Sequence, residues 1–350
     1  MVIDKIGMGE RVDKYKGIEL KAEITNVCTT GNCKFCSPMF RPATKEAGTD
    51  HFLRKFSQNL DDYLSHGGRK IILTGGGEPL DAPAKLFGAL KEVRKQVEEK
   101  HVELELLTVY SNGVNILKSA GKEIEGGAVG TQEGNATYLD ILKELGVTDI
   151  NLSISGLTAE ERTRITGDEM GSIDFDAVIP EIVRRGIRVM TRSTVTEGGI
   201  DDVQHVSKFT EWMAGLGAHI VYFSDLFNVS VRGQETTPGN QNVLKWTDEH
   251  RVDFASLIEE VNSNESFAFV SKTERHGGQG TTWEFKHRPT GVKVLFGSLD
   301  IGNEPAGKDV YGYVKPDGSM SGTNNASAGR DLIGVEALKK YRPKRDDWDQ

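Results

Sequence analysis

Long apolar runs are absent from the sequence, and no stretch approaches the roughly 20 apolar residues that a membrane-spanning helix needs. The amino-terminal stretch MVIDKIGMGERVDK also lacks the apolar core of a secretory signal peptide. From these two absences we expect a cytoplasmic protein with no membrane partner.

A surplus of basic residues is absent as well. The chain has 43 lysine and arginine residues against 52 aspartate and glutamate residues, which gives a formal net charge of -9. Nucleic-acid-binding proteins usually have a basic surplus or a basic stripe that neutralises phosphates. We therefore expect no nucleic-acid partner.

Cysteine is scarce, and its distribution is uneven. The chain has three cysteines, Cys28, Cys33 and Cys36, all within nine positions. Three cysteines cannot pair completely, and disulfide frameworks are typical of smaller secreted domains. Clustered thiols in a reducing compartment indicate a metal site instead.

From about residue 18 to residue 228, apolar and β-branched runs alternate with amphipathic stretches. Six strands are predicted, at 17–25, 70–75, 103–113, 150–156, 187–196 and 219–227. Helical stretches between them include 85–100, 138–146, 175–186 and 206–217. Strands joined by helical crossovers form a parallel sheet, which is either doubly wound or closed into a barrel.

The pattern changes after residue 228. We expect a linker at 232–242, one helix at 246–262, and two hairpins at 281–296 and 310–320. In the first part of the chain, the Gly-rich stretch 118–136 predicts an insertion or mobile loop. The carboxy-terminal part is thus expected to be an α+β extension.

The cysteines directly follow the first predicted strand, so they lie on a loop at the carboxyl end of that strand, where parallel barrels gather their ligands. The C-x4-C-x2-C spacing suits a 4Fe–4S cluster with one open iron, or a zinc ion completed by an outside ligand. No nearby CxxC or HxxxH supplies a fourth zinc ligand, and His51 is the nearest histidine. The spacing therefore favours iron–sulfur over zinc.

Two further turns follow neighbouring strands. Gly75, Gly76, Gly77, Glu78 and Pro79 end the second strand, and Ser111, Asn112 and Gly113 end the third. Glycines let the backbone approach a ligand closely, and the Glu78 carboxylate can bind an amino group. These polar groups are expected at one edge of the sheet.

On these motifs the chain resembles the radical SAM superfamily. The resemblance covers roughly residues 18–228 and implies a partial (β/α)6 TIM-like barrel that holds one 4Fe–4S cluster. S-adenosylmethionine (SAM) would chelate the open iron through its amino and carboxylate groups. The implied organisation is a lead-in at 1–17, the core barrel at 18–228 and a substrate-specificity or capping region at 229–350.

The resemblance also implies roles for individual residues. Cys28, Cys33 and Cys36 would ligate the cluster, and Phe35 would pack against the adenine. The SAM contacts would come from the strand ends and from two inward residues of strands four and five: Gly76, Gly77 and Glu78 at the amino group, Ser111 and Asn112 near the ribose, Ser153, and Arg192 at the carboxylate. The chain departs from the usual C-x3-C-x2-C loop by one residue, which Gly31 can absorb with a positive φ.

The cysteine count limits the reaction. After one cluster no thiol remains for a second cluster, a methyl-carrying pair or hydrogen-atom donation. The resemblance then implies reductive cleavage of SAM to a 5′-deoxyadenosyl radical that abstracts hydrogen from a small polar metabolite such as a nucleoside, nucleotide sugar or amino acid. We expect rearrangement, elimination or carbon–carbon bond formation, with an external electron donor such as flavodoxin or ferredoxin. Two alternatives remain: a peptide-modifying radical SAM enzyme and a non-catalytic zinc-binding protein.

Overall fold

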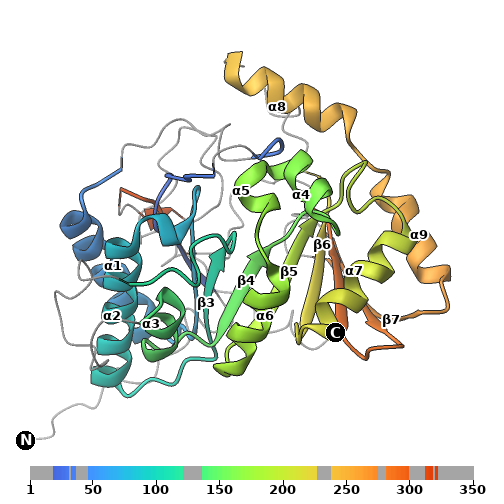
Figure 1. Ribbon diagram of the computed structural model, residues 1–350. Helices are drawn as coiled ribbons and strands as arrows, with labels where there is room; N and C mark the ends of the chain where they lie inside the picture. Colours follow the sequence, from blue (N-terminus) through green and yellow to red (C-terminus); the bar gives the residue numbers. More distant parts are fainter. Residues whose placement is uncertain are drawn as a thin grey trace, which may run out of the picture.

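The structure is a computed structural model, and it describes residues 19–30, 33–36, 46–120, 136–226, 238–274, 281–298, 312–317 and 320–321 (Figure 1). Most of the Gly-rich stretch, residues 121–135, lies outside the described part, as do residues 232–237 of the expected linker and all residues after 321.

One parallel sheet organises the chain. Its six central strands lie side by side in sequence order and pair in parallel, as the alternating pattern predicts. They are β1 (Glu19–Glu23), β2 (Lys70–Thr74), β3 (Leu106–Ser111), β4 (Asp149–Ser153), β5 (Arg188–Thr194) and β6 (Ile220–Ser224). The described strands do not close into a ring, so the expected partial barrel is confirmed.

The carboxy-terminal strands extend this same sheet at both of its edges. The complete order is β11-β10-β1-β2-β3-β4-β5-β6-β9-β8-β7. The added strands are β7 (Phe267–Glu274), β8 (Thr281–His287), β9 (Lys293–Gly297), β10 (Gly312–Val314) and β11 (Met320–Ser321). Both expected hairpins form, as the antiparallel pairs β8–β9 and β10–β11. The sequence pattern predicts neither β7 nor the parallel pairing of β10 with β1.

Helices connect the strands of the core. Before β4 they are α1 (Thr49–Ser65), the short helix η2 (Pro79–Asp81), α2 (Pro83–Lys100) and α3 (Tyr138–Glu144). After it come α4 (Ala159–Thr166), α5 (Asp168–Gly171), α6 (Phe175–Arg184) and α7 (Val203–Gly215). In the described part of the chain, no helix is long and apolar enough to cross a membrane.

The expectation of one helix at 246–262 is wrong, because two helices divide that stretch. Helix α8 (Pro238–Glu249) begins inside the expected linker, and α9 (Phe254–Ser263) begins after a break. Asp253 caps α9 by accepting a hydrogen bond from the Ser256 N–H at 3.1 Å. Proline suits a first helical position, which explains the start of α8 at Pro238.

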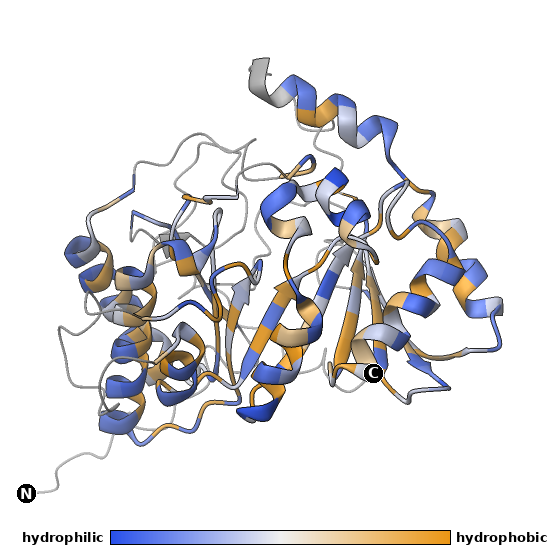
Figure 2. Cartoon of the chain, in the orientation of Figure 1, coloured by the Kyte–Doolittle hydropathy of each residue, from blue (hydrophilic) through white to orange (hydrophobic). Residues whose placement is uncertain are grey.

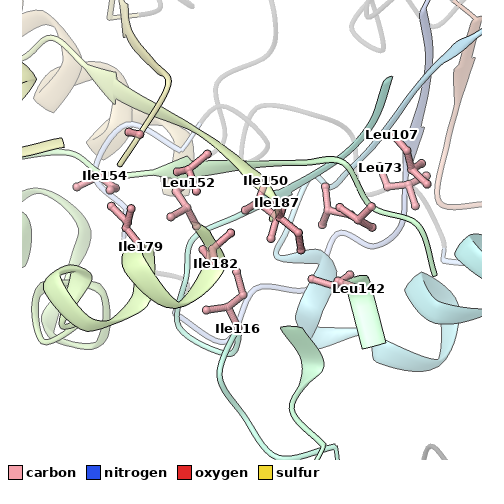
Figure 3. Packing of buried hydrophobic residues seen from close by; sticks show 14 of the residues in the cluster. Leu73, Leu107, Ile116, Leu142, Ile150, Leu152, Ile154, Ile179, Ile182 and Ile187 are labelled. Atoms are coloured by element: carbon pink, nitrogen blue, oxygen red, sulfur yellow. The ribbon is translucent and has the colours of Figure 1, made fainter. Parts of the chain in front are cut away.

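The two faces of the sheet differ in polarity. On one face, Ile150 and Leu152 of β4 join Ile179 and Ile182 of α6 in the buried apolar cluster (Figure 3). The alternation of side chains along a strand places Asn151 and Ser153 on the opposite face. We call this opposite face the inner face. Polar and apolar residues alternate along β4 in Figure 2, so the apolar side chains of this strand face the helices and its polar ones lie on the inner face.

Candidate functional site

The three cysteines lie after β1, at the carboxyl end of the parallel strands. None of the three is in a disulfide, all have intermediate exposure, and the Cys36 N–H donates to the Cys33 carbonyl at 3.2 Å in a tight turn. The backbone N–H of Lys34 donates to the carbonyl of Ile165 in α4 at 3.0 Å, which ties the loop to the region after β4.

The thiols influence one another. Burial and, to a smaller extent, the neighbouring Cys36 and Cys28 together raise the pKa of Cys33 to about 12. The Cys28 sulfur lies 2.9 Å from the Thr30 hydroxyl, and the Cys33 sulfur lies 3.7 Å from the Met170 sulfur. Without a cation the Cys33 thiol therefore keeps its proton, and only a bound cation would stabilise its thiolate form in these partly buried surroundings.

The cysteine sulfurs are further apart in this structure than the ligands of one bound zinc ion would be. In the described ranges, the one group of three ligand atoms that all lie within 4.8 Å of one another is Asp201, Asp202 and His205, so the cysteine sulfurs are spread more widely. Tetrahedral zinc, with Zn–S bonds of about 2.3 Å, would hold its sulfurs roughly 4 Å apart. His51 is exposed and belongs to no such group.

The glycines after β2 hold the turn against the cysteine loop. The Gly77 N–H donates to the Thr25 carbonyl at 3.0 Å, and the Glu78 N–H donates to the Val27 carbonyl at 2.9 Å. A Cβ at Gly77 would lie 1.8 Å from the Val27 carbonyl oxygen, and one at Gly75 would lie 2.9 Å from the Thr25 oxygen. Packing therefore requires glycine at positions 75 and 77, and the expected contact of Gly76 and Gly77 with a ligand stays a prediction.

Glu78 joins the turns that follow β2 and β3. Its carboxylate accepts hydrogen bonds from the Ser111 hydroxyl at 2.9 Å, the Asn112 N–H at 2.7 Å and the Leu80 N–H at 3.2 Å. Burial raises the pKa of Glu78 to about 7, although these hydrogen bonds act in the opposite direction. The structure thus brings Glu78, Ser111 and Asn112 together, and three of the roughly four acceptor positions of the carboxylate are used within the protein.

Two further carboxylates, which sequence analysis missed, position the cysteine loop. Asp81 accepts from the Thr29 N–H and from the Asn115 side chain, each at 2.7 Å. Glu46 accepts from the Thr25 hydroxyl at 2.6 Å and from Lys85 at 3.0 Å. Burial alone would raise the pKa of Glu46, but these hydrogen bonds and one from the backbone of Asn26 lower it.

Phe35 packs against the protein itself. Its ring centroid lies 6.2 Å from that of Trp246 in α8, and Trp246 stacks on His250 at 4.2 Å. The aromatic residue of the cysteine loop therefore contacts the carboxy-terminal region. Its expected contact with an adenine remains a prediction.

Ser153 and Arg192 form a second group on the inner face. They are registered partners on β4 and β5, and the Arg192 guanidinium lies 4.2 Å from the ring centroid of Tyr222 and 5.9 Å from that of Tyr110. Within the described residues, no hydrogen bond or ion pair joins this group to the Glu78 network. The two sets of predicted residues therefore occupy neighbouring but separate positions.

The comparisons with known proteins bear on the fold. No protein-family model matches the sequence, and no curated protein matches it. Among solved structures, SuiB from Streptococcus suis has a TM-score of 0.50 at 10% identity, over 93% of this chain and 64% of the SuiB chain. This chain therefore spans less than two thirds of the length of SuiB. The SAM-bound form of SuiB gives a TM-score of 0.49 at 11% identity, over 90% and 62% of the two chains.

Two other matched structures are radical SAM enzymes. HemN from Escherichia coli, a coproporphyrinogen III oxidase, matches with a TM-score of 0.39 at 9% identity, over 77% of this chain and 67% of its own. The methyltransferase TsrM from Kitasatospora setae, with cobalamin and a [4Fe-4S] cluster bound, gives a TM-score of 0.30 at 16% identity, over 54% of this chain and 34% of the TsrM chain. The fold shared with SuiB agrees with the partial barrel that the resemblance implied.

Proposed function

We propose that this chain, which has the fold of the radical SAM enzymes, holds one 4Fe–4S cluster on Cys28, Cys33 and Cys36 and uses it to cleave SAM. The observation that carries the proposal is the convergence of three thiols, none in a disulfide, on the loop after β1, next to the turns that follow β2 and β3. Thiolates are the ligands of such clusters, and a site with three of them leaves one iron open.

In this proposal the protein supplies position and surroundings. Asp81 and Glu46 fix the cysteine loop through its backbone and the end of β1. Glu78 has one acceptor position left for the amino group of SAM, beside Gly76 and Gly77. When bound, the cluster and SAM would supply a 5′-deoxyadenosyl radical that takes a hydrogen atom from the substrate.

We propose the remaining SAM contacts from the positions of their residues in the fold. Ser111 and Asn112 lie beside Glu78, near the expected ribose, and Ser153 lies on the inner face. Phe35 can reach an adenine only on the side that Trp246 leaves open. Arg192 was expected to meet the SAM carboxylate, and its place on the inner face also suits a carboxylate of the substrate.

The proposed reaction is hydrogen abstraction followed by rearrangement, elimination or carbon–carbon bond formation in a small polar metabolite. The support is the cysteine count, because no thiol of this chain remains for other chemistry once three ligate the cluster. The electron would come from an external donor such as flavodoxin or ferredoxin. The core barrel at 18–228 and the specificity region at 229–350 are part of the same proposal, and modification of a peptide is the alternative.

Anaerobic purification tests the cluster. Wild-type protein should be brown and contain about four irons per chain, and C28A, C33A and C36A should each lose both the colour and SAM cleavage. T29V, in the same loop, is the control: the Asp81 contact to its backbone is retained, so iron should bind. Zinc in place of iron would refute the proposal, and about eight irons would contradict the cysteine count.

A further inference from the structure

The inner face contains polar groups that the protein itself does not satisfy. The Asn151 side chain is 2% exposed; its amide nitrogen donates to the Met190 sulfur at 3.2 Å, but its Oδ1 has no partner. The Nε of Arg192 is likewise buried and unpartnered. A buried polar atom without a partner costs about 1–3 kcal/mol, a cost that an ordered water or a ligand removes.

Aromatic rings hold the Arg192 guanidinium in place. It stacks on Tyr222, its registered neighbour on β6, and approaches Tyr110, the registered neighbour of Asn151 on β3. Tyr222 in turn packs so closely on Gly297 of β9 that a Cβ there would lie 1.7 Å from the tyrosine oxygen. Four strands therefore fix the position of one positive charge.

No carboxylate of the described residues pairs with this guanidinium, whereas other cations near the inner face have partners. Lys21 pairs with Glu19, Lys70 with Glu105, and Lys293 with Glu284. A single guanidinium matches the single charge of a carboxylate better than the double charge of a phosphate, and its fork binds carboxylates in a bidentate way.

The position of Asn151 separates this site from the one proposed for SAM. Asn151 lies two residues, about 7 Å, further from the carboxyl end of β4 than Ser153. The cysteine loop and the Glu78 network lie at the carboxyl ends of the strands. In the proposed function, the amino group of SAM is held there by Glu78, and the open iron is chelated by both the amino and the carboxylate group, so SAM does not require Arg192.

We propose that Arg192 and Asn151 recognise the substrate, and that the substrate is an amino acid or a close derivative. Arg192 would bind its carboxylate, and the Asn151 oxygen would accept a hydrogen bond from the neighbouring ammonium or amide N–H. This inference rests on the proposed function, because it assumes that SAM occupies the strand ends. The methionyl end of SAM contains the same carboxylate and ammonium groups. The experiment therefore tests binding of free amino acids and binding of SAM separately.

The first arm uses the free L-amino acids and their carboxamides as probes, with binding followed by calorimetry and thermal shift on anaerobic full-length protein. At least one amino acid should bind to the wild type, and its carboxamide should bind about ten- to a hundred-fold more weakly, the range for a charge-assisted hydrogen bond. R192Q should weaken binding of the amino acid by a similar factor and leave binding of the carboxamide unchanged. N151L should weaken both.

The second arm measures SAM affinity in the same variants. R192Q and N151L should leave the dissociation constant of SAM unchanged. R192K, which keeps the charge without the fork, should bind the acid with intermediate affinity. R188Q is the control, because Arg188 lies on the same strand at its other end and pairs with Asp149. It removes the same charge and should bind the acid like the wild type.

Three outcomes would overturn the inference. They are the absence of carboxylate-dependent binding by any amino acid, a loss of SAM affinity in R192Q, and an R192Q protein that loses thermal stability while its binding is unchanged. Protein that binds no iron but still binds the amino acid through Arg192 would refute the proposed function and not the site.

Discussion

At the scale of single residues, the buried carboxylate of Glu78 makes the stability of the folded protein depend on pH. Its pKa is about 7 in the folded protein against an ordinary value of 4.5, because burial disfavours the charged form. Between these two pH values the folded protein holds a proton that the unfolded chain has released. Its contribution to stability is therefore complete below pH 4.5 and is lost as the pH rises through about 7.

We predict that wild-type protein loses stability relative to E78Q over this range, since glutamine does not titrate. The difference in unfolding free energy should change by something on the order of 3 kcal/mol, as measured by urea denaturation at several pH values. E105Q, at an exposed carboxylate paired with Lys70, is the control and should show no such change. A difference between wild type and E78Q that is constant with pH would show that Glu78 titrates normally.

The sequence predicted the residues of the site better than their contacts. Cys28, Cys33 and Cys36 were evident because ligand spacing is local along the chain, and Glu78 and Asn112 were evident because they follow strands. Asp81 was not, since its partner Thr29 is 52 positions away and carries no pattern of its own. Contacts between loops of this kind depend on the register of the sheet, which local sequence does not specify.

At the scale of elements, the hairpin β8–β9 is attached to α7 through one buried histidine. His287 is 0% exposed, its Nδ1 lies 2.9 Å from the Thr290 hydroxyl, and its Nε2 lies 3.3 Å from the Ser207 hydroxyl. Burial lowers the pKa of His287, while the carboxylate of Glu211 acts in the opposite direction. The hairpin is therefore held by the neutral form of the ring.

We predict that acid weakens this attachment. Since the folded pKa lies below the ordinary value of 6.5, the contribution of His287 is complete above pH 6.5 and is lost as the pH falls. The melting temperatures of wild type and H287Q should converge as the pH falls from 7 to 5. H51Q, at an exposed histidine, should keep the melting temperature of the wild type at every pH. Melting curves of wild type and H287Q that stay parallel would contradict the prediction.

The central strands were predictable because each forms an apolar run between helical stretches. The carboxy-terminal elements were harder. Apolar periodicity runs from Trp246 through α9 and hides the break, which depends on the capping interaction of Asp253. Strand β7 is an edge strand whose outer part is largely exposed, with Phe269 and Val270 each 53% exposed, so it lacks the alternation that marks a half-buried strand.

At the scale of the whole molecule, the strand that precedes the cysteines, β1, is held at its outer edge by the carboxy-terminal strand β10. β10 pairs with β1, and its residue Val314 is 0% exposed in the apolar core. We predict that V314D destabilises the protein by about 3 kcal/mol or more, because it buries an unpaired charge. K315D, at the adjacent half-buried position, should cost less than about 1 kcal/mol.

Iron content is the second readout of this pair of variants. V314D should retain less iron than K315D at the same temperature, since loss of β10 would loosen β1 and the loop that follows it. Equal iron content in two folded proteins would show that the cysteine loop is independent of the carboxy-terminal strands.

The pairing of β10 with β1 also has a consequence for the order of events during synthesis. The outer neighbour of β1 is translated roughly 290 residues after it, a delay of about 15–60 s at 5–20 residues per second. Throughout this time the strand next to the three thiols has an open edge, which is a template for pairing with other chains. Nascent chains are therefore most exposed to aggregation, and their thiols to oxidation, before the last strands arrive.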